Sequence, residues 1–142
     1  EAYRLIQNNG TGLLMQGTRE WKDYRVTAEI KPHLVKSFGL AVRVQGMRRY
    51  YALLLKEKNK ACLLKALDGN ITLSEKDFIW DFGRNYELAF QIQGTRLKGW
   101  VDNQLIFDVE DTTRTLDGGG IALVCEEGRV TTEAVIVQPA ID

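Results

Sequence analysis

The chain has 142 residues, of which 44% are hydrophobic and 27% charged, and its 19 basic and 19 acidic residues cancel to a net charge of zero. This length suits one domain with a single hydrophobic core, and the balanced charge argues against a dedicated nucleic-acid or membrane-surface protein. No apolar run approaches the roughly 18 residues of a membrane span, and no signal peptide opens the chain.

The chain begins with Glu1 rather than Met, so we expect residues 1–142 to be a single domain that is mature or excised from a longer protein. Two cysteines are too few for a disulfide scaffold, and one histidine is too few for most zinc sites. Free buried cysteines and the missing signal peptide favour the cytoplasm.

Alternation of apolar and polar residues predicts β-strands along most of the chain. In residues 23–31, for example, every second side chain from Tyr24 to Ile30 is apolar and the intervening ones are polar. The clearest predicted strands, in chain order, are residues 23–31, 37–44, 50–55, 85–93, 119–126 and 135–137. The third and the last of these are apolar on both faces, as expected for strands that are covered on both sides or lie beside another element.

Strand parity assigns individual side chains to the core or to the outside. In residues 37–44 it places Val42 and Val44 inward and Arg43 outward. In residues 96–102 it places Leu97 and Val101 inward and Trp100 outward.

Short connectors rich in Gly, Asn and Asp separate the strands, as in tight hairpins. They are residues 58–59, 68–70, 94–95, 102–103 and 128–129. Residues 77–84, which contain Trp80, are expected to form a bent loop that plugs one end of the core. We count about twelve candidate strands and no helix, which implies an all-β domain of two antiparallel sheets packed face to face, or a barrel.

The order of the motifs resembles the concanavalin A-like lectin/glucanase superfamily in its LamG-like branch. The similarity rests on W-K-D-Y-R-V-T-A-E-I at 21–30, F-G-L-A-V-R-V at 38–44, R-Y-Y-A-L-L-L at 49–55, Y-E-L-A-F-Q-I-Q-G-T-R-L-K at 86–98, W-V-D-N-Q-L-I-F-D at 100–108 and G-G-G-I-A-L-V at 118–124. It covers roughly residues 14–137 and implies a two-sheet antiparallel jelly-roll sandwich. These motifs specify the fold and name a ligand poorly.

Three groups within that branch are the most similar. They are levan-type carbohydrate-binding modules, the 3-keto-disaccharide hydrolase domain and, through residues 39–55 and 118–129, an accessory domain of bacterial ADP-ribosylglycohydrolase-like proteins. The resemblance therefore implies either a sugar-binding accessory domain or a glycoside-processing enzyme. Arg43, in a G-L-x-x-R context, is the residue carried over from the levan-binding type.

Catalytic groups are hard to find in this chain. The E-x-D-x-x-E strand motif of laminarinase-like relatives is missing, and the adjacent Glu126 and Glu127 point to opposite faces. Asp108 and Glu110 share a face, but they lie at a strand end that we interpret as a solvated edge. His33 is expected in a surface loop. We therefore predict no catalytic residue.

We expect no metal or other cofactor. Calcium accepts oxygen ligands such as those of Asp68, Asn70, Asp102 and Asp117, but these residues also form ordinary turn sequences, which is the interpretation we favour. Both Cys62 and Cys125 are expected to point inward as small buried side chains, with a disulfide between them as the alternative.

The sequence points most directly to a sugar site around Trp100. An outward indole forgoes the stabilisation of burying on the order of 200 Å², and stacking on a sugar ring would explain its position. Glu29, Arg43 and Glu126 are outward residues of other strands that could bind hydroxyls, with Arg48 and Tyr50 at the rim of the same concave sheet. The alternatives are a Trp100 covered by a loop or a neighbouring domain, and a Glu29–Arg43 ion pair across strands.

From these residues we predict a non-catalytic carbohydrate-binding accessory domain. Its expected partners are a saccharide and a covalently linked catalytic domain that processes glycosides or ADP-ribose, with no nucleic acid and no membrane. The alternatives are a glycoside hydrolase-like catalytic domain, or an interdomain packing or oligomerisation module of an ADP-ribosylglycohydrolase-like protein.

Overall fold

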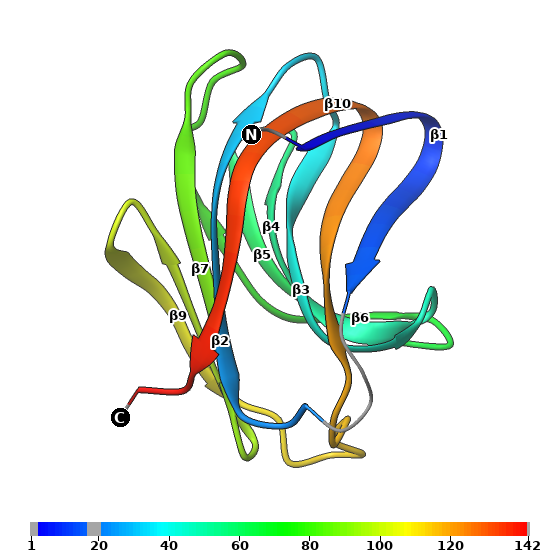
Figure 1. Cartoon of the computed structure of the whole chain (residues 1–142), viewed down its shortest axis with the longest axis vertical. Coiled ribbons are helices and arrows are strands. Elements are labelled where there is room, and N and C mark those ends of the chain that lie inside the picture. Colours follow the sequence, from blue (N-terminus) through cyan, green and yellow to red (C-terminus); the bar gives the residue numbers. More distant parts are fainter. Residues whose placement is uncertain (1–2, 17–20, 142) are drawn as a thin grey trace.

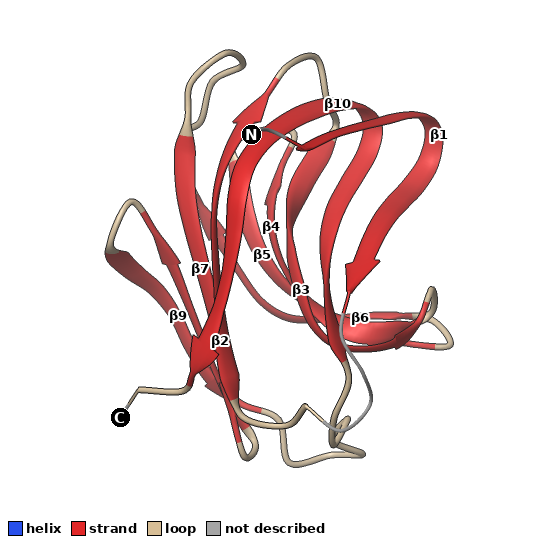
Figure 2. Cartoon of the chain, viewed as in Figure 1, coloured by secondary structure: helices blue, strands red, loops and turns tan. Residues whose placement is uncertain are grey.

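The structure, a computed structural model, describes residues 3–16 and 21–141. This part of the chain contains ten strands and no helix (Figure 2). The strands are β1 (Tyr3–Gln16), β2 (Tyr24–Pro32), β3 (Ser37–Gly46), β4 (Arg49–Lys56), β5 (Lys60–Leu67), β6 (Asn70–Asp77), β7 (Tyr86–Gln93), β8 (Arg96–Val101), β9 (Gln104–Glu110) and β10 (Gly120–Pro139).

All neighbouring strands are antiparallel and join into one sheet of order β6-β5-β4-β3-β10-β2-β7-β8-β9, with β1 paired to β10. The sheet folds over at β10, which arches from one layer into the other (Figure 1). Residues 120–126 of β10 pair with β3, and residues 130–139 pair with β2. We call the layer of β3–β6 with the first part of β10 the front layer, and the layer of β2 and β7–β9 with the rest of β10 the back layer.

The core lies between the two layers and follows the predicted alternation. In β2 the side chains from Tyr24 to Ile30 alternate between buried and more exposed, and in β8 Leu97 and Val101 are buried. The core continues into the front layer through Leu53 of β4 and Leu123 of β10. The all-β sandwich predicted from the sequence is therefore confirmed.

The prediction of a hairpin at residues 128–129 is wrong, because β10 continues through these two residues as a bent strand. Glu127 has a φ of 47°, in the left-handed region, and Gly128 packs where a Cβ would meet the Leu34 carbonyl oxygen at 2.0 Å. The irregular backbone bends the strand between the layers without reversing it. This continuity also helps to explain why the described chain has ten strands and not about twelve.

Residues 78–85 connect β6 to β7 and close one end of the core, as expected. Trp80 is 8% exposed, and its indole nitrogen donates to the Lys56 carbonyl oxygen at 2.6 Å. Its ring packs edge-on against Phe38, with ring centres 5.3 Å apart. Phe82 covers the outside of Trp80 and is itself exposed.

The other end of the sandwich is closed by polar side chains, and here the prediction for Arg43 is wrong. Arg43 has a φ of 49°, and the pairing of β3 with β10 shifts between Ala41 and Val44. This bulge changes the parity of β3, so that Val44 joins the outer face and Arg43 is only 3% exposed. Glu29 therefore has no ion pair with Arg43 among the described residues.

The guanidinium of Arg43 links four segments of the chain, which are its own strand β3, residues 22–23, Gly94 and Leu116. It donates to the carbonyl oxygens of Lys22, Gly94 and Leu116 at 3.0, 2.8 and 2.7 Å, and to an Asp23 carboxylate oxygen at 3.0 Å. Its backbone N–H donates to the Tyr24 hydroxyl at 2.6 Å. These bonds hold the β9–β10 connection against the ends of β2 and β7.

A buried ion pair completes this closure. Lys65 Nζ lies 2.7 Å from the Asp111 carboxylate, and their side chains are 2% and 6% exposed. The same carboxylate accepts the Tyr51 hydroxyl at 2.5 Å, and that hydroxyl accepts the Leu116 N–H at 3.1 Å. Burial raises the pKa of Asp111, but the bonds from Lys65 and Tyr51 outweigh burial and hold the pKa below its usual value. We call Tyr24, Arg43, Tyr51, Lys65 and Asp111 the closed polar end.

Candidate functional site

The six predicted site residues lie in three different places. Arg48, Tyr50 and Glu126 belong to the front layer, where Tyr50 and Glu126 line a common cavity. Glu29 and Trp100 lie on the back layer, on strands β2 and β8. Arg43 belongs to the closed polar end. The single site of six residues that the sequence predicts is therefore not present, and only the front layer brings several of them together.

Small side chains form a row across the outer face of the front layer. Ala122 of β10 pairs with Ala41 of β3, which in turn pairs with Ala52 of β4. Larger residues such as Tyr50 and Leu54 stand on either side of this row on the same face of β4. Because alternate residues share a face, these alanines lie on the same outer face as Tyr50 and Leu54, and all five side chains are at most 8% exposed. We call this outer surface of the front layer the hollow face.

Two adjoining cavities occupy the hollow face. The larger, of about 380 Å³, crosses five strands, and the smaller, of about 240 Å³, lies near the β3–β4 and β5–β6 turns. Both are lined by Tyr50 and Asn70, so they form one continuous groove. The larger is lined by Lys36, Ser37, Tyr50, Leu54, Lys56, Glu57, Cys62, Leu64, Asn70, Val124 and Glu126, and the smaller by Met47, Arg48, Tyr50, Ala66, Asp68, Gly69 and Asn70.

Glu126 supplies the carboxylate of the larger cavity. One of its oxygens accepts the Ser37 hydroxyl at 2.9 Å, which orients the group across β3 and β10. Burial raises the pKa of the nearby Tyr50 phenol, and the negative charge of Glu126 raises it further. The phenol therefore stays protonated at neutral pH and is available as a hydrogen-bond donor.

Charged pairs mark the rim of the larger cavity. The Lys36 Nζ atom lies 4.0 Å from a carboxylate oxygen of Glu57 and 3.9 Å from one of Glu127. The Lys56 Nζ atom lies 3.5 Å from a carboxylate oxygen of Glu75. These side chains are 37–53% exposed. The lining residues Lys36, Lys56, Glu57 and Glu126 balance in formal charge, and Glu75 and Glu127 add negative charge beside the cavity.

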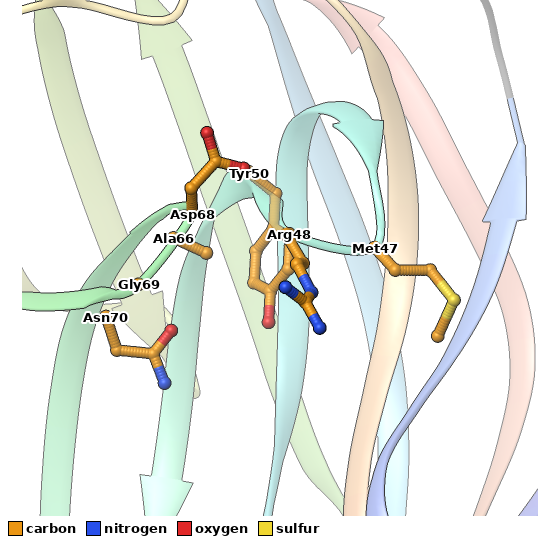
Figure 3. Close-up of a pocket in the computed structure, with 7 residues that line it drawn as sticks. All are labelled: Met47, Arg48, Tyr50, Ala66, Asp68, Gly69 and Asn70. Atoms are coloured by element: carbon orange, nitrogen blue, oxygen red, sulfur yellow. The ribbon is translucent and has the colours of Figure 1, made fainter.

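The smaller cavity is lined by three polar side chains that can donate hydrogen bonds (Figure 3). The Tyr50 hydroxyl, the Arg48 guanidinium and the Asn70 amide point to the same side, while the Asp68 carboxylate points the other way. Asp68 is also paired with Arg49, at 2.8 Å. Within the described part of the chain, no hydrogen bond or ion pair engages the side chains of Arg48, Tyr50 or Asn70.

Trp100 points outward as parity predicts, but it is covered. The Arg25 guanidinium lies over its ring, 4.1 Å from the centre, and the indole is half-buried. The side chain of the neighbouring Gln91 exchanges two hydrogen bonds with the backbone of Ile141, at 2.9 and 3.0 Å. The Arg25 side chain and the backbone at Ile141 therefore occupy part of this face of the back layer, and the indole is only partly open.

The remaining candidates have structural surroundings. Both cysteines are free and buried; Cys125 points into the core, whereas Cys62 faces the larger cavity, contrary to the predicted inward position. Burial raises the pKa of both thiols. His33 makes a 2.8 Å hydrogen bond with Thr131. The side chains that the structure describes include no group of three or more His, Cys, Asp or Glu residues that could hold a metal ion.

Two of the calcium candidates, Asp68 and Asp102, lie in hairpin turns. Asp68, between β5 and β6, has a φ of 54°, and Asp102 and Asn103, between β8 and β9, have φ values of 50° and 66°. Asp102 accepts the Glu87 N–H at 2.9 Å and pairs with Arg84.

In residues 3–16 and 21–141, no helix is long and apolar enough to cross a membrane.

Sequence reasoning missed Ser37 and Asn70 as members of the groove. The sequence places Ser37 at the start of a strand, and Asn70 in a turn and among the calcium candidates. Both residues line the groove because of the order of the strands, which local patterns do not give.

No model of a known protein family matches this chain, and no curated protein matches its sequence. Solved structures do resemble it. The carbohydrate-binding module CBM66 from Bacillus subtilis superimposes with a TM-score of 0.84 at 16% identity, covering 93% of this chain and 84% of that one. Caenorhabditis elegans galectin LEC-6 gives a TM-score of 0.64 at 14% identity, covering 95% of each chain.

A third similar structure is the GH43 protein BlXynB from Bacillus licheniformis, with a TM-score of 0.71 at 10% identity. The match covers 96% of this chain but only 32% of that one. At these identities the likenesses concern the fold. The chain shares the jelly-roll sandwich fold of these structures.

Proposed function

We propose that this protein is a non-catalytic carbohydrate-binding domain whose ligand occupies the hollow face. The observation that carries the proposal is the groove of two adjoining cavities, in which Tyr50, Asn70 and Glu126 present polar groups beside apolar walls. Ligand pockets typically enclose about 300–1,000 Å³ and combine apolar surface with a few placed polar groups. The similar carbohydrate-binding module and galectin support the same class of ligand.

The chemistry of the larger cavity suits a sugar. A carboxylate such as that of Glu126 can accept hydrogen bonds from two hydroxyls, and the Asn70 amide can both donate and accept. Leu54, Leu64 and the ring of Tyr50 offer apolar surface for the C–H groups of a sugar ring. A sugar thus finds partners for both its hydroxyls and its carbon skeleton.

The absence of catalysis is part of the proposal. Glycosidases need two carboxyl groups that flank the bond to be broken. Of the two carboxylates lining the larger cavity, Glu57 is 53% exposed in its side chain and pairs with Lys36 at the rim. An exposed, ion-paired carboxylate is poorly suited to act as a general acid, which favours binding over hydrolysis.

We further propose that the domain accompanies a catalytic domain in a longer protein. The match to about a third of the GH43 protein's chain is consistent with this fold occurring as one part of a larger molecule. The link to ADP-ribosylglycohydrolase-like proteins rests on the sequence resemblance and stays a prediction, as does a role in packing between domains.

The test is a calorimetric titration of a panel of neutral and acidic oligosaccharides into the wild type and Glu126→Gln. We expect saturable binding that Glu126→Gln weakens roughly tenfold or more, because the substituted amide cannot accept at both atoms. Glu29→Gln is the matched control, since it makes the same change at an exposed position of the back layer.

Two results would overturn the proposal. One is the failure of every saccharide, neutral or charged, to bind in a saturable way. The other is binding that survives Glu126→Gln but is lost in Trp100→Ala, which would move the site to the back layer.

A further inference from the structure

The smaller cavity presents hydrogen-bond donors that have no partner. The Arg48 guanidinium, the Tyr50 hydroxyl and the Asn70 amide line this cavity and point to one side of it (Figure 3). Burial and the charge of Glu126 raise the pKa of the Tyr50 phenol, which keeps its proton. Among the described side chains none accepts a hydrogen bond from these three groups.

The one acidic side chain of this cavity is already engaged. Asp68 pairs with Arg49 at 2.8 Å and points away from Arg48, Tyr50 and Asn70. The Gly69 carbonyl oxygen accepts the Leu67 N–H at 2.9 Å, and the Arg48 carbonyl oxygen accepts the Asp68 N–H at 3.0 Å. Met47 and Ala66 contribute apolar surface. The Arg48 guanidinium is therefore the one charged group of this cavity without a partner among the described residues, and the hydroxyl and the amide beside it can both donate, which favours a negatively charged acceptor.

The two ends of the groove thus differ in chemistry. At the far end, the Glu126 carboxylate accepts hydrogen bonds and suits neutral hydroxyls. At the Arg48 end, a guanidinium fork with two neutral donors suits a planar or tetrahedral oxyanion, with which charge-assisted bonds are the strongest. Tyr50 lies between the two ends and lines both cavities.

From this asymmetry we infer that the ligand is an acidic saccharide, with a carboxylate or sulfate oxyanion bound by Arg48, Tyr50 and Asn70. A neighbouring neutral sugar unit occupies the cavity of Glu126. This inference rests on the proposed carbohydrate-binding function and specifies the class of sugar and its orientation along the groove.

The experiment compares pairs of probes that differ only in charge. One pair is a disaccharide of one uronate and one neutral sugar and its methyl ester, and the other is a disaccharide with a single sulfate and its desulfated form. We expect the charged member of one pair to bind roughly tenfold or more tightly than its neutral partner, as typical for hydrogen bonds to a charged group. The pair that shows the preference identifies the oxyanion, and added salt reduces the preference.

Arg48→Gln should remove the preference for the charged probe, because it removes the guanidinium that binds the oxyanion. Arg48→Lys keeps the charge without the fork and should retain part of the preference. Arg84→Gln makes the same charge change beside the β6–β7 connection, at the opposite end of the sandwich, and should leave the preference intact.

The outcomes separate this inference from the function on which it rests. Equal binding of charged and neutral probes, with both weakened by Glu126→Gln, overturns the acidic ligand and leaves the carbohydrate-binding function standing. A preference that persists in Arg48→Gln shows that the oxyanion binds elsewhere and overturns the assignment. Binding of no saccharide, charged or neutral, overturns both.

Discussion

The closed polar end and the hollow face use similar side chains in opposite ways. At the closed polar end, Arg43, Lys65 and Asp111 are almost fully buried, and the chain itself satisfies their polar groups. On the hollow face, Arg48 and the Tyr50 hydroxyl have no partner in the described chain. Buried polar groups are tolerated only when they are hydrogen-bonded, so the first set closes the fold. The second set is free to bind another molecule.

The largest predicted effect is on stability at the closed polar end. Asp111→Ala should lower the free energy of unfolding by about 3–5 kcal/mol, because it leaves the buried Lys65 ammonium without its counter-charge. Asp68→Asn, which breaks an exposed ion pair with Arg49 and keeps a residue type that tolerates the φ of 54°, should cost about 0–1 kcal/mol. Urea unfolding followed by fluorescence measures both values. Equal losses for the two variants would contradict the distinction between the regions.

Two adjacent tyrosines sharpen the comparison. Tyr51→Phe removes a buried hydroxyl that bonds to Asp111 and Leu116, so it should lower the free energy of unfolding by about 1–3 kcal/mol. Tyr50→Phe removes a hydroxyl with no described partner and should change stability by less than about 0.5 kcal/mol while weakening saccharide binding. Parallel unfolding and calorimetric titrations test this. The reverse pattern would refute the assignment of roles.

Acid should weaken the closed polar end. The folded-state pKa of Asp111 lies below its usual value of about 4. Its ionised form therefore contributes stability that is present above the unfolded pKa and is lost as the pH falls through the folded pKa. Between neutral pH and about pH 3, the wild type should lose more stability than Asp111→Asn. Parallel pH profiles from thermal unfolding would argue against this role of the carboxylate.

The smallest predicted effect is on the edge of the back layer. Arg96 and Asp108 form two hydrogen bonds of 2.7 Å across β8 and β9, and both residues are exposed. Asp108→Asn should cost less than about 1 kcal/mol, since solvent and salt screen such pairs. It should leave saccharide binding unchanged. A larger loss in the free energy of unfolding, measured in urea, would contradict the small contribution assigned to exposed ion pairs.

The sequence predicted the core well because strand parity is a local property. The alternation from Tyr24 to Ile30, and the inward Leu97 and Val101, are confirmed by their burial. Arg43 could not be placed, because its left-handed backbone conformation reverses the parity of β3 and the sequence gives no sign of that bulge. Hairpin signals likewise failed at Gly128, where tertiary packing bends β10 without ending it.

The site was only partly predictable. Parity identifies Trp100, Glu29 and Glu126 as outward residues, but it does not tell which layer carries each one. Glu126 meets Tyr50 because the strand order joins β10 to β4 through β3. Arg48 and Tyr50 were expected at the rim of a site, and both line the groove. What the sequence lacked was the long-range pairing that separates the two outer faces.

The most direct test of the central claim is to map a bound saccharide by backbone amide chemical shifts in solution. If the hollow face holds the ligand, the largest saturable shifts fall on β3–β6 and the first part of β10, with Tyr50 and Glu126 among them. Shifts confined to Trp100, Gln91 and their neighbours on the back layer would contradict the account.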